Sequence, residues 1–137
     1  MRATYFKMLV EALDNARTYG NCIVTGLGAV DCHDMIGEVA DLLLRSEDAV
    51  WVLCYGFCDG EVHLSLRTSD LSANAGVTVR RIVGRKGTGG GHNVLAGGCI
   101  PLAGEIESER KRTESMLVRR FLRAVGADER DGHRLIQ

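Results

Sequence analysis

The chain has 137 residues, of which 45% are hydrophobic and 26% charged, and its formal net charge is −1. This length allows one domain with a real core and excludes two ordinary ones, and the composition is that of an ordinary globular protein. No apolar run approaches the roughly 18 residues that a membrane-spanning helix needs, and the charged N-terminus does not resemble a secretory signal. Five scattered cysteines favour free thiols over a disulfide framework. We therefore expect a cytoplasmic protein with no membrane partner.

The first forty residues predict a helix, a strand and a second helix. Apolar residues recur at helical spacing up to Gly20, which suits a helix stop, and the β-branched run Cys22–Thr25 predicts a strand. Residues 26–31 resemble a dinucleotide-binding fingerprint, but Asp31 stands where the last glycine belongs, so we interpret them as a turn. Asp31 is then placed to cap the second helix. The core side of that helix is expected to hold Ile36, Val39, Ala40 and Leu43.

The clearest local pattern is a hairpin. Two strand-like runs, Ala49–Cys58 and Glu61–Arg67, flank Asp59-Gly60, a dipeptide typical of a type I′ turn. This turn sets the register, and side chains then alternate between the two faces. One face is predicted to be a core layer of Trp51, Leu53, Tyr55, Phe57, Val62, Leu64 and Leu66. The other is more polar and leaves room for a ligand, with Val52, Cys54, Gly56, His63, Ser65 and Arg67.

The second half alternates helices and strands. We expect a helix from about Asn74 to Val83, a glycine loop, a short helix starting within His92–Gly97, and an edge strand over Cys99–Leu102 because it holds the single proline. Ser108 is placed to cap a last helix that ends near residue 126, and its many basic residues are offset by glutamates, as on a solvated face. A poorly ordered tail is expected beyond it. Together these elements predict an α/β domain with a central mixed sheet and flanking helices.

A glycine-rich, basic segment is the strongest functional signal. It runs from Gly84 to Asn93 and contains three consecutive glycines followed by His92. Glycine lets the backbone approach a ligand, successive N–H groups can surround an anion, and a histidine can donate to a phosphate oxygen or shuttle a proton. Residues 71–104 contain four basic side chains and no Asp or Glu. This pattern favours a phosphate-binding surface over a flexible basic loop, although its glycine order is not that of a P-loop.

Two clusters that suggest a metal site do not have the geometry of one. Asp31, Cys32, His33 and Asp34 are adjacent on a predicted helix, where neighbouring side chains point about 100° apart. Cys54 and Cys58 lie four residues apart on a predicted strand, about 13 Å, which is too far for both to join His63 around one zinc ion. We predict no metal site in this chain.

Three motifs together resemble a known family. Ser65-Leu66-Arg67-Thr68, then a helix, then Gly89-Gly90-Gly91-His92 and Leu95-Ala96-Gly97-Gly98 resemble the DHH-associated domain, the C-terminal substrate-binding half of DHH-family phosphoesterases. That family includes RecJ-like exonucleases, nanoRNases, pAp phosphatases and cyclic-dinucleotide phosphodiesterases, and a related domain occurs in alanyl-tRNA synthetases. The resemblance implies that phosphate is held by Ser65, Arg67, Gly89, Gly90, Gly91 and His92. Asn93, where many members have another residue, joins this set with an open role.

The resemblance also implies what this chain lacks. The catalytic half of the family carries an Asp-His-His motif and further aspartates that bind two manganese ions, and no Asp-His-His occurs here. We therefore expect residues 1–20 to be a helical lead-in from a catalytic half, 21–126 the substrate-binding domain and 127–137 a flexible tail. Expected partners are a single-stranded oligonucleotide or small phosphorylated nucleotide and the catalytic domain itself, with a homodimer left open.

Three functions follow from these observations. The first is a nucleotide phosphate-binding domain that presents its ligand to a separate manganese centre, with no cofactor of its own and no activity as the isolated chain. The second is a metal-free enzyme that uses His92 as a general acid or base. It is less favoured because no nucleophile or paired carboxylate accompanies His92. The third is a stand-alone RNA-binding domain related to the synthetase C-terminal region.

Overall fold

The computed structural model describes residues 3–31, 33–104 and 106–137. Along the chain the elements are α1 (Ala3–Asn15), β1 (Arg17–Tyr19), β2 (Cys22–Ala29), α2 (Asp34–Leu43), β3 (Trp51–Cys58), β4 (Glu61–Thr68), α3 (Ala75–Val83), β5 (Thr88–Gly91), β6 (Leu95–Pro101), α4 (Glu107–Val125), a 3₁₀ turn (Glu129–Asp131) and β7 (His133–Arg134). The seven strands form one sheet in the order β5-β6-β4-β3-β2-β1-β7. β2 and β3 pair in parallel and the other neighbours are antiparallel. The predicted α/β fold with a mixed sheet is confirmed.

The central hairpin forms with the predicted register. Cys58 pairs with Glu61, and the pairing continues without a shift to the far end of both strands. Asp59 and Gly60 have φ values of 53° and 75°, the two positive values that a type I′ turn requires. The side chains of the predicted core layer are all buried in one cluster. Local turn chemistry therefore fixes which residues of β4 face away from that cluster, and these include Ser65 and Arg67.

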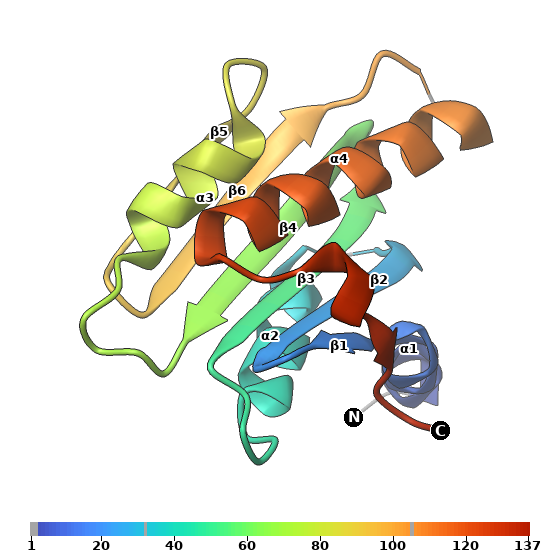
Figure 1. The fold of residues 1–137 in the computed structure, drawn as a ribbon. Helices are drawn as coiled ribbons and strands as arrows, with labels where there is room; N and C mark the ends of the chain where they lie inside the picture. Colours follow the sequence, from blue (N-terminus) through green and yellow to red (C-terminus); the bar gives the residue numbers. More distant parts are fainter. Residues whose placement is uncertain (1–2, 32, 105) are drawn as a thin grey trace.

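Helices cover the two faces of the sheet unequally. Figure 1 shows α3 and α4 on the near face and α1 and α2 on the far face. On the near face the core cluster joins β2, β3, β4 and β6 to the two helices. On the far face the second cluster joins α1 and α2 to β2 and β3, where it buries Val52 and Cys54. The far face of β4, β6 and β5 has no buried cluster among the described residues, and the candidate site lies there.

Three predictions in the first half are wrong in detail. The first helix ends at Asn15, and Gly20 lies instead in the β1–β2 turn, where its φ of 62° suits glycine. Residues 26–29 continue β2 through a register shift against β3, because the parallel neighbour satisfies their backbone groups. His33, not Asp31, is the N-cap of α2, and the His33 side chain makes no capping hydrogen bond. The predicted core side of α2 is confirmed, since all four of its residues are buried.

The second half holds the larger differences. α3 is confirmed, with Asn74 as its N-cap, but His92–Gly97 forms a turn and the start of β6, not a helix. β6 is not an edge strand, because β5 pairs with it on one side. The pairing begins at Thr88 opposite Cys99, so Pro101 has no β5 residue opposite it and its missing N–H leaves no β5 group unpaired. Ile106, not Ser108, is the N-cap of α4, and Gly126 ends that helix as predicted. Beyond it, the segment expected to be a poorly ordered tail contains the 3₁₀ turn and β7, which pairs with β1. None of the helices in the described ranges is long and apolar enough to cross a bilayer.

Candidate functional site

The uncovered part of the sheet is hollowed into a pocket of about 410 Å³, which we call the open-face pocket. Its floor is formed by β4, β6 and β5, and its wall by the N-terminal half of α2. Ser65 pairs directly with Gly97 and His63 with Cys99, so these side chains share one face of the sheet. The lining residues are His33, Asp34, Gly37, His63, Leu64, Ser65, Arg67, Thr88, Gly89, Gly97, Gly98 and Cys99.

Glycines create the hollow. A Cβ added at Gly97 would meet only the Leu64 carbonyl oxygen, at 3.4 Å, so the position opens into the pocket. The next residue faces the other way, since a Cβ at Gly98 would lie 2.8 Å from the Thr88 carbonyl oxygen and 2.9 Å from a Val83 methyl. The missing side chain at Gly97 therefore leaves space beside Ser65 for another molecule, while Gly98 is needed for close packing.

Arg67 is the cation of the open-face pocket and is nearly buried. Its Nε donates to Oδ1 of Asp41 at 2.6 Å, and its Nη1 donates to the carbonyl oxygens of Leu66 at 3.1 Å and Ala96 at 3.3 Å. Nη2 makes no hydrogen bond within the described residues. A Cβ at Gly37 would lie 2.8 Å from Nη2 and 3.6 Å from the Ser65 Oγ, so both groups flank this glycine. The guanidinium is thus held rigidly, with one nitrogen remaining for a ligand.

This geometry limits how Arg67 can hold a phosphate. A two-pronged clamp on phosphate needs two adjacent N–H groups, and the Nε edge of the guanidinium is already occupied by Asp41. What remains is a single charge-assisted donor beside a hydroxyl donor from Ser65. The sequence could not show this, because the pairing depends on how α2 docks across β4.

Two histidines at the other end of the pocket were not predicted as site residues. The rings of His33 and His63 stack with centroids 4.8 Å apart and an angle of 11° between their planes. Nε2 of His63 lies 3.6 Å from Oε1 of Glu61, and the other oxygen of that carboxylate accepts from the Cys99 thiol at 3.5 Å. His63 could have been found from its place on the polar face of the hairpin. His33 could not, because its position depends on the packing of α2.

The predicted glycine and histidine residues are only partly brought together. Gly89 lines the open-face pocket with Ser65 and Arg67, whereas Gly90, Gly91, His92 and Asn93 lie outside its lining. The turn that contains His92 is nevertheless close to Arg67 in the sheet. Leu95 pairs with Arg67 on one side and accepts from the His92 N–H at 2.8 Å on the other. His92 itself is exposed at this rim.

The β5–β6 turn is attached to the start of α3. The N–H groups of Ala75 and Gly76 donate to the carbonyl oxygens of Asn93 and His92, at 2.8 and 3.0 Å. The Asn74 side chain accepts from the next N–H of the helix at 3.1 Å. The N-terminal N–H groups of α3 are thus satisfied within the protein and are not offered to an anion.

The thiols differ sharply in their surroundings. Cys54 is fully buried, and this burial raises the pKa of its thiol, with the Arg67 charge opposing the rise only in part. Burial also raises the pKa of Cys22 to about 11. Cys99, in contrast, is half-buried and lines the open-face pocket. Cys32 lies outside the described residues. No group of three or more His, Cys, Asp or Glu side chains in the described ranges could hold a metal ion.

These surroundings predict selective alkylation. The thiolate is the reactive form, so a thiol with a raised pKa holds little of it at pH 8. Iodoacetamide at pH 8 is expected to modify Cys99 well before Cys54 or Cys22, as followed by peptide mass spectrometry over time. Modification of Cys54 at the rate of Cys99 in the folded protein would contradict this arrangement.

Comparisons with known proteins agree with the fold. Residues 20–119 match the model of the DHHA1 domain. An uncharacterised protein of Methanocaldococcus jannaschii is 30% identical over 131 residues, which cover 91% of this chain and 27% of the relative. An exopolyphosphatase-related protein from Bacteroides fragilis aligns with a TM-score of 0.60 at 14% identity, covering 91% of this chain and 37% of that one. The C-Ala domain of Aquifex aeolicus alanyl-tRNA synthetase aligns with a TM-score of 0.51 at 19% identity, and the alignment covers 74% of this chain and 96% of that one. The chain thus spans about a quarter of the length of the curated relative.

Proposed function

The chain belongs to the DHHA1 domain family, and on that basis we propose that its open-face pocket binds the phosphate of a small nucleotide or of a short single-stranded oligonucleotide. The observation that carries the proposal is the Arg67 guanidinium, anchored through two of its nitrogens, with Nη2 left beside the Ser65 hydroxyl. A preformed charged donor next to a hydroxyl donor suits a phosphate oxygen pair, and the anchoring removes the entropy cost of ordering the arginine on binding.

The rest of the pocket supports the same ligand class. The backbone at Gly97 is open, so a ligand can approach the strand closely. Asp34 is the carboxylate among the lining residues. Its side chain is 81% exposed and lies 3.6 Å from the His33 ring, which reduces its repulsion of an anion. The His33–His63 stack adds ring surface at the other end, where a nucleobase can pack. His92, at the Arg67 rim, is placed to reach the ligand from outside the pocket.

The role of this chain in hydrolysis is to bind and position. DHH phosphoesterases generally use divalent metals, and the donor groups of the described residues do not fit a resident metal ion. We infer that residues 21–126 hold the ligand and that a separate manganese-binding domain, reached through residues 1–20, supplies the hydrolytic metal centre. The pure 137-residue chain is then expected to release no product from phosphodiesters with or without Mn²⁺. Turnover abolished by His33→Ala would contradict this division of labour.

Phosphate dependence tests the proposal. Calorimetric titration of the chain with adenosine, adenosine 5′-monophosphate and pAp is expected to show at least tenfold tighter binding of the phosphorylated compounds, since one charge-assisted hydrogen bond contributes roughly 1.5–3 kcal/mol. Phosphorylated ligands are also expected to slow alkylation of Cys99 in the pocket. Equal affinity for adenosine and its phosphates would contradict the proposal.

A further inference from the structure

We propose that the groove between α3 and α4, on the opposite face from the open-face pocket, is a second anion site that binds the phosphate backbone of a nucleic acid strand. Two adjoining hollows of about 480 and 390 Å³ form this groove, and both are lined by Arg81 and Arg120. Arg85 and Lys86 line one of them, and Arg123 lines the other. We call these five residues the α3–α4 basic groove.

No carboxylate of the described residues lines the groove, and none occurs in the two segments that form it. Residues 71–104, which contain α3, hold four basic and no acidic residues, and residues 115–127, which include the C-terminal half of α4, hold three basic and no acidic ones. Glu114 lies on a different flank of α4, in a hollow with Tyr55. None of the five basic residues forms an ion pair within the described part of the chain. A concentrated positive surface on a chain of net charge −1 is the electrostatic pattern of a polyanion site.

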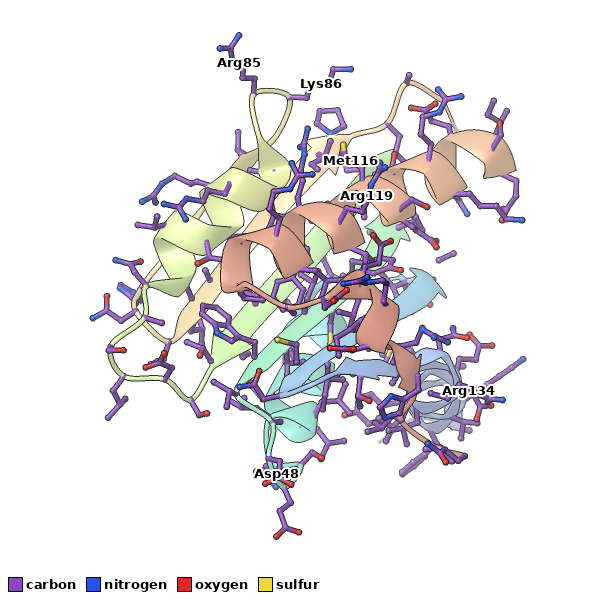
Figure 2. All side chains as sticks on the ribbon, viewed as in Figure 1. Asp48, Arg85, Lys86, Met116, Arg119 and Arg134 are labelled. Carbon is purple, nitrogen blue, oxygen red and sulfur yellow. The ribbon has the colours of Figure 1, made fainter. Side chains whose placement is uncertain are left out.

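One arginine is built into the groove by the fold. Nη1 of Arg120 donates to the Ile82 carbonyl oxygen at 2.9 Å, in the last turn of α3, where carbonyl groups lack helical partners. Gly84 permits this approach, since a Cβ there would lie 2.8 Å from Nη1, and its φ of 63° also favours glycine. The contact fixes α4 against α3 and holds a cation between them. Figure 2 shows Arg85 and Lys86 extending from the loop after α3, at one end of this near face.

The composition of the groove favours nucleic acid over an anionic membrane. The apolar residues that line it, Val83, Ile100 and Met116, are buried or half-buried, and no exposed large hydrophobic side chain of the described residues stands there to insert into a bilayer. No aromatic ring of the described residues lines it either, which excludes base stacking as the main contact. Binding should therefore be independent of sequence and carried by phosphate contacts. A strip of five cations over two hollows suits successive phosphates of a strand better than a single ion.

The test is fluorescence anisotropy of a labelled dT strand of about 12 nucleotides with the full 137-residue chain across a range of salt concentrations. Arg81 and Arg123 are both exposed and make no side-chain hydrogen bond in the described structure, so Arg81→Ala/Arg123→Ala should fold normally. We expect it to bind the strand ten- to a hundredfold more weakly at low salt. The slope of log affinity against log salt should become shallower by about 0.7 for each phosphate that the variant no longer neutralises.

The matched control is Arg112→Ala/Arg130→Ala. It removes the same charge from two arginines that are paired with Glu109 and Asp128 outside the groove, and it should leave the affinity within about twofold. Equal weakening in both double variants, or none in the first, would overturn the proposal. So would tighter binding of tripolyphosphate or of phosphatidylserine vesicles than of the strand. Neither Arg81 nor Arg123 lines the open-face pocket, so Arg81→Ala/Arg123→Ala should bind pAp as tightly as the wild type does, and failure of this proposal is distinguishable from failure of the proposed nucleotide site.

Discussion

Gly97→Val is expected to abolish nucleotide binding and leave the fold intact. The added side chain projects into the open-face pocket, where a Cβ would meet only one atom, at 3.4 Å, and the two further methyl groups would occupy the space beside Ser65. Valine also suits a strand better than glycine, so the free energy of unfolding should be unchanged or higher. We expect affinity for adenosine 5′-monophosphate to fall more than a hundredfold by calorimetry, with an unchanged far-ultraviolet circular dichroism spectrum.

Gly98→Val is the matched control, because it makes the same change on the opposite face. Its Cβ would lie 2.8 Å from the Thr88 carbonyl oxygen and 2.9 Å from a Val83 methyl, so the strand and α3 must shift. This variant should lower the midpoint of urea unfolding clearly, whereas Gly97→Val should not. If Gly97→Val binds nucleotide as the wild type does while remaining folded, the pocket is not the binding site.

Arg67→Ala is expected to weaken nucleotide binding by about ten- to a hundredfold and also to destabilise the protein. The variant lacks the Nη2 donor and the three hydrogen bonds that the Arg67 side chain donates to Asp41 and to the carbonyl oxygens of Leu66 and Ala96. Hydrogen bonds to charged groups contribute roughly 1.5–3 kcal/mol each. Asp41 is left unpaired but 60% exposed, so water can solvate it, and the free energy of unfolding should fall by about 2–3 kcal/mol in urea.

Ser65→Ala separates binding from stability, since its hydroxyl makes no hydrogen bond to another described residue. It should weaken nucleotide binding by about fivefold, as expected for one neutral hydrogen bond of about 1 kcal/mol, without moving the unfolding midpoint.

Arg45→Ala serves as the charge control for Arg67→Ala, because Arg45 is an exposed arginine beyond α2. It should leave nucleotide affinity unchanged. If folded Arg67→Ala protein binds nucleotide with wild-type affinity, the Arg67 guanidinium does not take part in binding.

The sequence predicts the parts of the site that are set locally. Asp59-Gly60 fixes the hairpin register, and alternation then places Ser65 and Arg67 on one face of β4. The glycine segment is different. Gly89–Gly91 has no side chains to favour a strand, so its local pattern predicts a loop, and it becomes β5 only because β6 pairs with it. The pairing of Gly89–Gly91 with β6 depends on the tertiary fold, and the sequence around the glycines does not show it.

The remaining features depend on how helices dock. The bond from Arg67 to Asp41 and the stack of His33 on His63 both require α2 to lie along one side of β4. The α3–α4 basic groove likewise joins two helices that are far apart in the chain. Taken alone, the last helix predicts a solvated face with balanced charge, but its glutamates and its C-terminal arginines lie on different parts of the surface. Hydrophobic periodicity predicts which face of a helix is buried, but it does not predict which element packs against the helix.

The central claim is that a phosphorylated nucleotide binds on the uncovered face of β4, β6 and β5. The most direct measurement is a nuclear magnetic resonance titration of the ¹⁵N-labelled chain with pAp, following every backbone amide. We expect the largest shifts at the amides of Ser65, Gly89 and Gly97, with a weaker response at His92 and none in the C-terminal half of α4. Saturable shifts confined to α3 and α4, or none at millimolar pAp, would contradict the claim.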